Sequence, residues 1–490
     1  MTTMQGSLNR CTPSTLCRAA AKAAPAALRS SRKNISFSSS HSFSSTACTA
    51  AGSSSAAAGA EQKDQTRIKD FAKYLSPLSK RRQPSAIRKL MPLLEQPGMV
   101  SLGGGLPNSA LFPFTSLKFG ISDPHNGDET ELHLNTEELG AALQYSPTPG
   151  LPKLVTHLRD LQTWEHGVDV GKSPHHHYDV MVSVGSQDAL TKAFEMLLDP
   201  AQDELFLESP TYSGSLAFLQ PFGVKMKPVA TDEFGLKPEA LQEALEKSND
   251  GENKRRVLYT IPTAQNPSGS TLSNDRREAI YDIASAYDII ILEDDAYYYN
   301  HPARENVKSF LSLDCDGRVI RFDTFSKLIS SGMRIGFVTG PPKLIERLSF
   351  HTQATNLHNS GVSQIMLSKL LDHWGKHGFD EHAKNVASFY CRRRDVMLAA
   401  AERHLTGLAA WSPPEAGMFL FLKLNGIDDT KVLIEEKAAA ANVLFVPGQS
   451  FDPLDRPSPY VRASFSTASD EDMDIAMERL AALIANETSL

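Results

Sequence analysis

The chain has 490 residues, 41% of them hydrophobic, and a formal net charge of -7 at pH 7. A chain of this length can bury a large core and is predicted to form two domains. The negative charge argues against general nucleic-acid binding, and no apolar stretch approaches the roughly 18 residues of a membrane span. The five cysteines are scattered, so no disulfide framework and no zinc site are predicted.

Residues 1–60 have the composition of an organelle transit peptide. They contain no Asp or Glu, and six basic residues lie among serines and alanines. Drawn as a helix, most of these basic side chains fall within an arc of about 100°. Such a composition directs import, and we expect the mitochondrial matrix, with a plastid or a cytoplasmic location as alternatives. The competing interpretation is a disordered tail, because Ser/Ala-rich chains bury too little surface to fold.

From about residue 61 the pattern is that of a globular protein, and residues 61–120 are predicted to join the small domain. Apolar residues at helical spacing predict a helix over 68–78 and a clearer one over 151–164.

Residues 121–380 are predicted to form a large domain in which short apolar strands alternate with helices. This alternation is typical of a mostly parallel central sheet covered on both faces. The predicted strands are 179–185, 205–208, 257–261, 289–293, 318–324 and 334–339, and the predicted helices are 186–198, 275–287 and one after Pro210.

Residues 381–490 lack the regular alternation of strands and helices and are predicted to form a smaller α+β domain. The predicted elements are helices at 393–405, 431–441 and 473–484 and strands at 418–424 and 460–465.

Lys327 is the strongest candidate for chemistry. It lies in Asp323-Thr-Phe-Ser-Lys-Leu-Ile-Ser-Ser-Gly-Met-Arg. Its amine can form an imine with an aldehyde, while the flanking hydroxyls and Arg334 can hold a phosphate. Asp294 ends an apolar strand upstream, where it can keep a ring nitrogen protonated. Together these residues suit pyridoxal phosphate as a cofactor.

Further polar residues follow predicted strands, where ligands bind in open α/β sheets. Ser186 and Gln187 open a helix whose backbone amides can hold an anion. Tyr212 can stack on an aromatic ring, and Asn266 can donate a hydrogen bond to a phenolic oxygen. Taken singly, these are better explained as a capped turn, a core tyrosine and an Asn-Pro turn. Their combination favours a cofactor site.

Residues from about 65 to 490 resemble the fold-type-I, class I and II aminotransferases, which depend on pyridoxal phosphate. Within that family the chain is most similar to the kynurenine/α-aminoadipate group and the fungal aromatic group. The motifs occur in the family's order: Ser101-Leu-Gly-Gly-Gly-Leu-Pro-Asn, Ala142-Leu-Gln-Tyr-Ser-Pro, Gly185-Ser-Gln, Asn266-Pro-Ser-Gly, Glu293-Asp-Asp-Ala-Tyr-Tyr, Ser326-Lys-Leu-Ile-Ser-Ser-Gly-Met-Arg and Arg462-Ala-Ser-Phe-Ser.

The resemblance implies a role for each candidate residue. Lys327 would bind the cofactor and later act as the general base, and Asp294 would pair with the ring nitrogen. Arg462 would clamp the substrate's α-carboxylate. The residues expected around the ring are Tyr212, Asn266 and Tyr297, and those expected around the phosphate are Ser186, Gln187, Thr324, Ser326 and Arg334.

The resemblance also implies substrates and partners. The amino donor would be 2-aminoadipate, kynurenine, an aromatic amino acid or glutamate, and 2-oxoglutarate would accept the amino group in a ping-pong reaction. Arg88 would bind a distal carboxylate, with Gly105 lining the same side, and Phe419 and Leu357 would give apolar walls for aromatic substrates. Family members are homodimers, so Tyr145 is expected to reach the phosphate of the neighbouring subunit.

Two other functions fit parts of the same pattern. A lyase on this scaffold would use the same cofactor residues, and some transcription regulators carry an aminotransferase-like domain behind a DNA-binding module. The leader lacks the paired amphipathic helices of such a module. His175-His-His177 is interpreted as a surface loop, because no cysteine or carboxylate stands at ligand spacing, so no metal site is predicted.

Overall fold

The computed structural model describes residues 67–100, 102–103, 105–171, 177–248 and 254–488. The predicted leader lies outside this range, as do His175 and His176. Among the described residues, no helix is long and apolar enough to cross a membrane.

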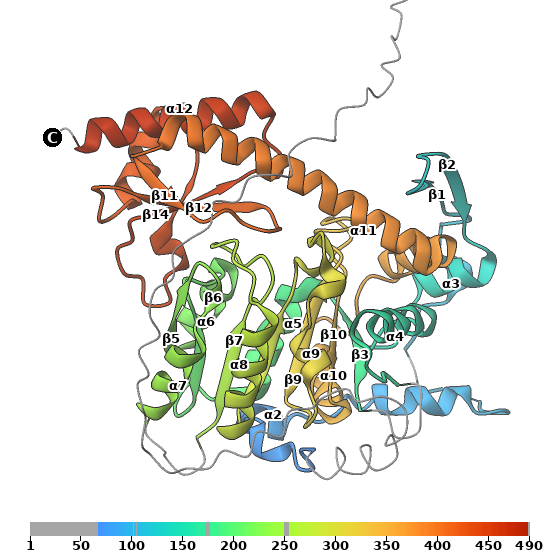
Figure 1. Ribbon diagram of the computed structural model, residues 1–490. Coiled ribbons are helices and arrows are strands. Elements are labelled where there is room, and N and C mark those ends of the chain that lie inside the picture. The colour runs from blue at the N-terminus through green and yellow to red at the C-terminus, as the bar shows by residue number, and fades with distance from the viewer. Residues whose placement is uncertain (1–66, 101, 104, 172–176, 249–253, 489–490) are drawn as a thin grey trace, which may run out of the picture. The chain divides into compact units, whose positions relative to one another are not determined.

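The larger domain is built on a mostly parallel sheet of eight strands in the order β3-β10-β9-β8-β7-β4-β5-β6 (Figure 1). Strand β10 runs antiparallel to both of its neighbours, and β6 runs antiparallel to β5. The predicted central sheet is therefore confirmed. The strands are β3 (Asp179–Ser183), β4 (Glu204–Ser209), β5 (Lys225–Asp232), β6 (Gly235–Leu236), β7 (Arg256–Thr260), β8 (Ile290–Asp294), β9 (Val319–Thr324) and β10 (Gly336–Gly340).

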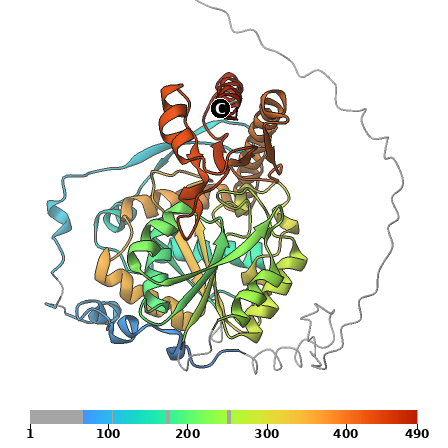
Figure 2. The ribbon, with the colours of Figure 1, turned by 90° about the vertical axis from the view of Figure 1, so that its left-hand side faces the viewer.

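Helices cover both faces of this sheet (Figure 2). Successive strand residues point to opposite faces. On β8, Ile291 accordingly packs into one apolar cluster, whereas Ile290 and Leu292 pack into another. The covering helices are α4 (Pro152–His166), α5 (Gly185–Leu197), α6 (Ser213–Phe222), α7 (Pro238–Glu246), α8 (Asn274–Ala286), α9 (Phe310–Leu313) and α10 (Pro342–Thr355).

A smaller antiparallel sheet in the order β11-β12-β14-β13 confirms the predicted α+β domain. Helix α11 (Gly361–Leu405) crosses the predicted boundary at residue 380, and its helical geometry breaks at Gly375. The domain boundaries remain predictions. The other elements are β11 (Ala409–Trp411), β12 (Phe419–Leu424), η6 (Leu433–Ala438), β13 (Val446–Pro447), η7 (Gly448–Phe451), β14 (Tyr460–Ser464) and α12 (Asp470–Thr488).

The N-terminal segment differs from its prediction. Instead of one helix over 68–78, two short helices flank Ser76, whose side chain caps the second. Pro77 begins that second helix, since proline fits a first turn but not a helix interior. The remaining elements are η1 (Ala72–Tyr74), α2 (Pro77–Arg81), η2 (Arg88–Glu95), η3 (Ser109–Leu111), β1 (Lys118–Ser122), β2 (Glu129–His133), α3 (Thr136–Leu143), η4 (Tyr298–Asn300) and η5 (Arg304–Asn306).

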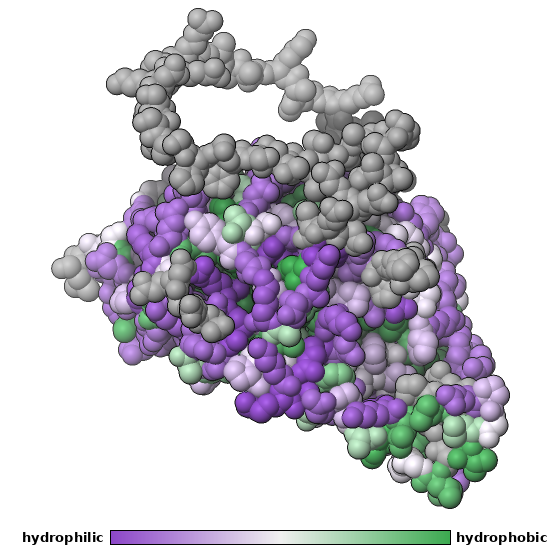
Figure 3. Space-filling view, turned by 90° about the horizontal axis from the view of Figure 1, so that it is seen from below, coloured by the Kyte–Doolittle hydropathy of each residue, from purple (hydrophilic) through white to green (hydrophobic). Residues whose placement is uncertain are grey.

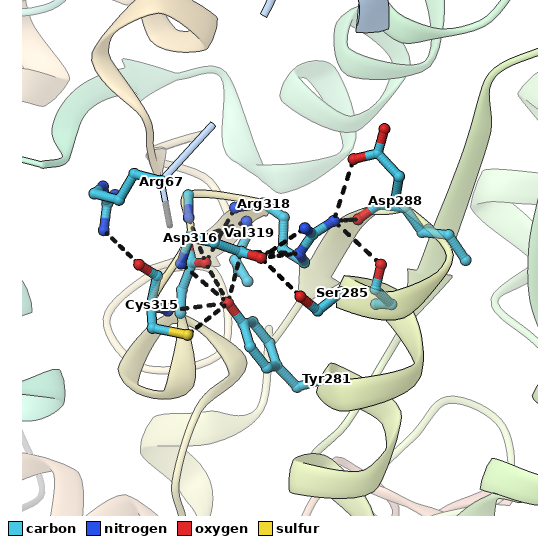
Figure 4. Close-up of polar contacts among 12 residues, drawn as sticks. Arg67, Tyr281, Ser285, Asp288, Cys315, Asp316, Arg318 and Val319 are labelled. Atoms are coloured by element: carbon cyan, nitrogen blue, oxygen red, sulfur yellow. Dashed lines mark hydrogen bonds and ion pairs between the residues drawn. The ribbon is translucent and has the colours of Figure 1, made fainter. Parts of the chain in front are cut away.

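A polar network fastens the start of the described chain to the large domain (Figure 4). The Tyr281 hydroxyl donates to Asp316 at 2.7 Å and accepts from the Cys315 amide at 3.0 Å. Arg318 pairs with Asp316 at 2.6 Å, and Arg67 donates to the Cys315 carbonyl at 3.4 Å. Residue 67 is therefore held against the loop between α9 and β9.

Arg321 on β9 balances three buried acids near the sheet's centre. It lies 3.1 Å from Glu293, 2.8 Å from Asp295 and 2.9 Å from Asp323, and all four side chains are fully buried. The β8–β9 register sets Glu293 directly opposite Arg321. Burial raises the pKa of Asp323 to about 7, and the Arg321 charge acts in the opposite direction.

We predict that Arg321→Met costs about 3–5 kcal/mol of unfolding free energy at pH 8, because it leaves buried carboxylates without their cation. Those carboxylates keep protons in the folded state that they lose in the unfolded state. Stability of the variant therefore falls as pH rises above about 4, and the loss relative to wild type shrinks at pH 5.5. Urea unfolding at both pH values measures the effect.

Arg276→Met is the matched control, since Arg276 pairs with Asp232 at 2.7 Å in a partly exposed position. It should cost less than about 1 kcal/mol. Equal losses in the two variants, or a loss from Arg321→Met that does not change with pH, would contradict this role of Arg321.

Candidate active site

A pocket of about 320 Å³ lies beyond the carboxyl ends of the central strands. It brings together most of the predicted site residues. Its lining is Ser186, Gln187, Tyr212, Ile261, Asn266, Asp294, Ala296, Tyr297, Thr324, Ser326, Lys327, Ser331, Arg334, Phe419 and Arg462.

The topology explains why these residues meet. Parallel strands end at one edge of the sheet, so the residues that follow β3, β4, β7, β8 and β9 are neighbours in space. Arg334 precedes β10, whose amino end lies at the same edge because β10 is antiparallel. Phe419 and Arg462 come from the smaller sheet and complete the pocket.

The start of α5 lines one end of the pocket. Gly185 opens this helix at a φ of +78°, and a Cβ there would lie 2.7 Å from Arg334 Nη2. Arg334 Nη1 donates to Ser326 Oγ at 3.3 Å, and Thr324 Oγ1 donates to the same oxygen at 3.0 Å. A helix N-terminus, two hydroxyls and a guanidinium at one place suit a phosphate group.

The amine of Lys327 lines the pocket without a hydrogen-bonding or ionic partner among the described residues. Burial lowers its pKa, and the positive charges of Arg334 and Arg462 lower it further. A larger share of the amine is therefore neutral near pH 7 than in an exposed lysine, as a nucleophile or base requires.

Asp294 is the acid of the pocket. Its Oδ2 accepts a hydrogen bond from the Tyr259 hydroxyl at 2.9 Å, while its buried Oδ1 has no partner among the described residues. Burial raises the pKa of Asp294 to about 7, and the nearby charges of Asp295 and Asp323 also raise it. A buried acid with an unused oxygen fits a ligand that brings a cationic N–H.

Arg462 faces the pocket from β14. Its Nη1 donates to Asn266 Oδ1 at 2.8 Å, and its guanidinium lies 4.2 Å from the centre of the Phe419 ring and 4.9 Å from that of Phe451. The stacked rings and the hydrogen bond hold the planar fork in place, as a carboxylate-binding arginine requires.

Three predicted residues do not line this pocket. Tyr145 is 48% exposed and packs edge-on against His358, and Gly105 is exposed. Arg88 donates instead to the carbonyl of Ser146 at 2.8 Å. The roles expected of Tyr145 in a neighbouring subunit, and of Arg88 and Gly105 at a bound substrate, remain predictions.

The pyridoxal phosphate that the resemblance implies fits the residues present. The unpartnered Oδ1 of Asp294 suits the ring nitrogen, the start of α5 suits the phosphate, and the free amine of Lys327 suits the aldehyde. The Tyr212 ring packs over Gly214, where a Cβ would lie 2.4 Å from its Cζ atom, so this ring has a fixed position.

Sequence reasoning missed four residues here. Ile261, Ala296 and Ser331 line the pocket, and Tyr259 supports Asp294 from behind. Ile261 and Ala296 are apolar, so nothing in the sequence marks them as site residues except that each follows the end of a strand. Tyr259 sits inside a strand, where a tyrosine is ordinarily core, and only the pairing of β7 with β8 shows its partner.

Comparisons with known proteins agree with this geometry. The model of the family "Aminotransferase class I and II" matches residues 117–480. The mitochondrial kynurenine/alpha-aminoadipate aminotransferase of Bos taurus is 42% identical over 431 residues, covering 85% of this chain and 99% of the relative.

Solved structures are similar as well. Aminotransferase Aro8 from Candida albicans matches with a TM-score of 0.77 and 29% identity, covering 86% of this chain and all of the other. The kynurenine aminotransferase of Pyrococcus horikoshii, solved in complex with PMP, matches with a TM-score of 0.66 and 30% identity over 86% of this chain and 98% of the other. The chain therefore belongs to the class I and II aminotransferases and is a pyridoxal-phosphate-dependent aminotransferase.

Proposed function

We propose that the aminotransferase reaction takes place around Lys327 and that its preferred donors are 2-aminoadipate and kynurenine, with 2-oxoglutarate as the acceptor. The observation that carries the location is the convergence of Lys327, Asp294 and Arg462 on one pocket. Together they supply a nucleophilic amine, an acid for a ring nitrogen and a fork for a carboxylate.

The cofactor, when bound, supplies an electron sink for the carbanion at the substrate's Cα. Lys327 then moves the proton from Cα, and its lowered pKa leaves the amine free to accept it. Asp294 would keep the ring nitrogen protonated through its unpartnered Oδ1. Arg334, Ser326 and the start of α5 would hold the phosphate, and Tyr212 would stack on the ring.

Arg462 orients the substrate by its α-carboxylate. Its Nη1 is committed to Asn266 Oδ1, and its buried Nε has no partner among the described residues. A bidentate pair between the guanidinium fork and the carboxylate would set the Cα–H bond within reach of Lys327. The side chain of Asn266 also hydrogen-bonds to Tyr297, and both residues are proposed to hydrogen-bond to the ring's phenolic oxygen.

The proposed donors rest on two observations. A relative that is 42% identical over most of its length is named for kynurenine and α-aminoadipate. Phe419 and Ile261 also give the pocket apolar walls that suit a long or aromatic side chain. Arg88 is proposed to bind the distal carboxylate of aminoadipate after leaving the Ser146 carbonyl.

We predict that 2-aminoadipate and kynurenine convert the bound cofactor from its aldehyde to its amine form at least tenfold faster than alanine does. The distal groups of these two donors reach the apolar walls and Arg88, and alanine has none. The visible absorbance of the holoenzyme, followed after each amino acid is added alone, measures the rate.

Lys327→Ala should bind the cofactor without the aldehyde's characteristic band and show no conversion. Lys308→Ala is the control, because Lys308 is a half-exposed lysine paired with Glu278. Conversion by Lys327→Ala at the wild-type rate would remove Lys327 from the mechanism. A faster rate with alanine would overturn the proposed donor class.

A homodimer is proposed on the exposure of the N-terminal segment. Apolar side chains gather on a projecting part of the face seen from below (Figure 3). Over residues 87–106 several large apolar side chains are exposed, with Val100 at 88% and Leu102 at 99%. Such a patch is typical of a protein interface, and we propose that a second copy of the chain covers it.

We predict that the wild type sediments as a dimer at micromolar concentration. The double variant Val100→Asp/Leu102→Asp should dissociate at least tenfold more readily, because it places charges in an apolar interface. Val432→Asp/Leu444→Asp is the control, since both residues are exposed on the smaller domain. A monomeric wild type, or the same weakening in both variants, would contradict the proposal.

Import into the mitochondrial matrix is proposed from the acid-free, basic leader and from the mitochondrial relative. We predict that residues 1–60 fused to a fluorescent protein carry it into mitochondria. Replacing Arg18, Lys22 and Arg29 by Gln should leave the fusion in the cytosol, because the basic stripe is lost. Microscopy with a mitochondrial stain decides, and a plastid signal or a diffuse wild-type fusion would refute matrix import.

A further inference from the structure

Tyr259 lies directly behind the acid of the pocket. Its hydroxyl donates to Asp294 Oδ2 at 2.9 Å, and the hydroxyl of Ser215 donates to Tyr259 at 2.9 Å. Both side chains are fully buried, and neither lines the pocket. The two hydroxyls thus form a chain that ends on one oxygen of Asp294 and lies outside the pocket lining.

The elements that carry this chain are those that shape the pocket. Ser215 is in the first turn of α6, three residues after Tyr212, and Tyr259 is in β7 beside β8. The Tyr259 ring is held by an edge-on contact with Phe194 at 5.6 Å between centroids. The direction of the hydroxyl toward Asp294 is therefore fixed by packed secondary structure.

The consequence concerns the second oxygen of Asp294. A carboxylate turns about its last side-chain torsion with a broad preference. Because Oδ2 is tied to Tyr259, the position of Oδ1 is determined, and Oδ1 is the oxygen without a partner among the described residues.

We propose that Tyr259, supported by Ser215, is a positioning residue that aims Oδ1 of Asp294 at the nitrogen of the cofactor ring. This inference rests on the role of Asp294 under the proposed function. It extends that function by giving a positioning role to Tyr259 and Ser215, which lie outside the pocket.

The charges around Asp294 support the same conclusion. Burial raises its pKa, as do Asp295 and Asp323, whereas the hydrogen bond from Tyr259 lowers it, as does Arg321. A hydroxyl that donates to the carboxylate stabilises its charged form, which is the form that keeps a ring nitrogen protonated.

A double-mutant cycle separates positioning from plain packing. Tyr259→Phe keeps the ring and removes the hydroxyl, and Asp294→Asn removes the charge. The dissociation constant of pyridoxal phosphate from cofactor-free protein is measured by equilibrium dialysis for wild type, both single variants and the double variant. Tyr178→Phe is the matched control, since this buried tyrosine donates to the Asp314 carbonyl at 2.7 Å, away from the pocket.

We expect Tyr259→Phe to raise the dissociation constant about tenfold, the size of one hydrogen bond to a charged group. In the Asp294→Asn background the same change should have less than a twofold effect, because the charge that it supports is gone. Tyr178→Phe should leave the constant unchanged. Ser215→Ala should weaken binding in the same direction as Tyr259→Phe and by a smaller factor.

The outcomes distinguish two failures. If Asp294→Asn does not weaken cofactor binding, the proposed role of Asp294 is wrong. If it does, but Tyr259→Phe has no effect or an equal effect in both backgrounds, the positioning inference alone is overturned. Should Tyr259→Phe yield too little folded protein, Ser215→Ala carries the same test in the same two backgrounds.

Discussion

The candidate active site depends on one buried arginine, Arg321, which balances two of the three acids at the end of β8. Three acids occur in succession there, Glu293, Asp294 and Asp295, and all are buried. Because side chains alternate along a strand, the first and third face Arg321, while Asp294 shares the opposite face with Ile290 and Leu292. An unpaired buried charge is costly. Arg321 pairs with the other two acids, so the acid that it leaves unpaired is Asp294, which lines the pocket.

The pocket itself has an excess of positively charged side chains. Among the described lining residues, three are cationic, Lys327, Arg334 and Arg462, and Asp294 is the one acid. Burial lowers the pKa of Lys327 and that of Arg462, and repulsion from the charges of Arg334 and Arg462 lowers the pKa of Lys327 further. A phosphate bound at Arg334 and a carboxylate bound at Arg462 would relieve this repulsion and leave the amine of Lys327 free to react. The positive charge of the pocket thus favours anionic ligands such as a phosphate and a carboxylate.

The sequence pattern predicts most of the buried strands, but helices α7 and α10 were missed although each buries an apolar face. Buried strands such as β8 are continuous apolar runs, and the polar residues after them are brought together by parallel topology. The hairpin of β1 and β2 and the strand β5 were missed, because their side chains are largely exposed or half-buried and give no apolar run. The partners of Arg321 and Tyr259 lie on neighbouring strands, so only the register reveals them.

The proposed choice of substrate involves a residue that lies outside the pocket. Under the proposed function, the three cations in the described lining serve covalent chemistry, the phosphate and the α-carboxylate. A donor with a second carboxylate therefore needs a cation from elsewhere. Arg88 is suitably placed, since it is bound to the carbonyl of Ser146, next to Tyr145 and within the exposed apolar segment. The proposed dimer contact and the proposed selection of a dicarboxylic donor would then depend on the same segment, residues 87–106.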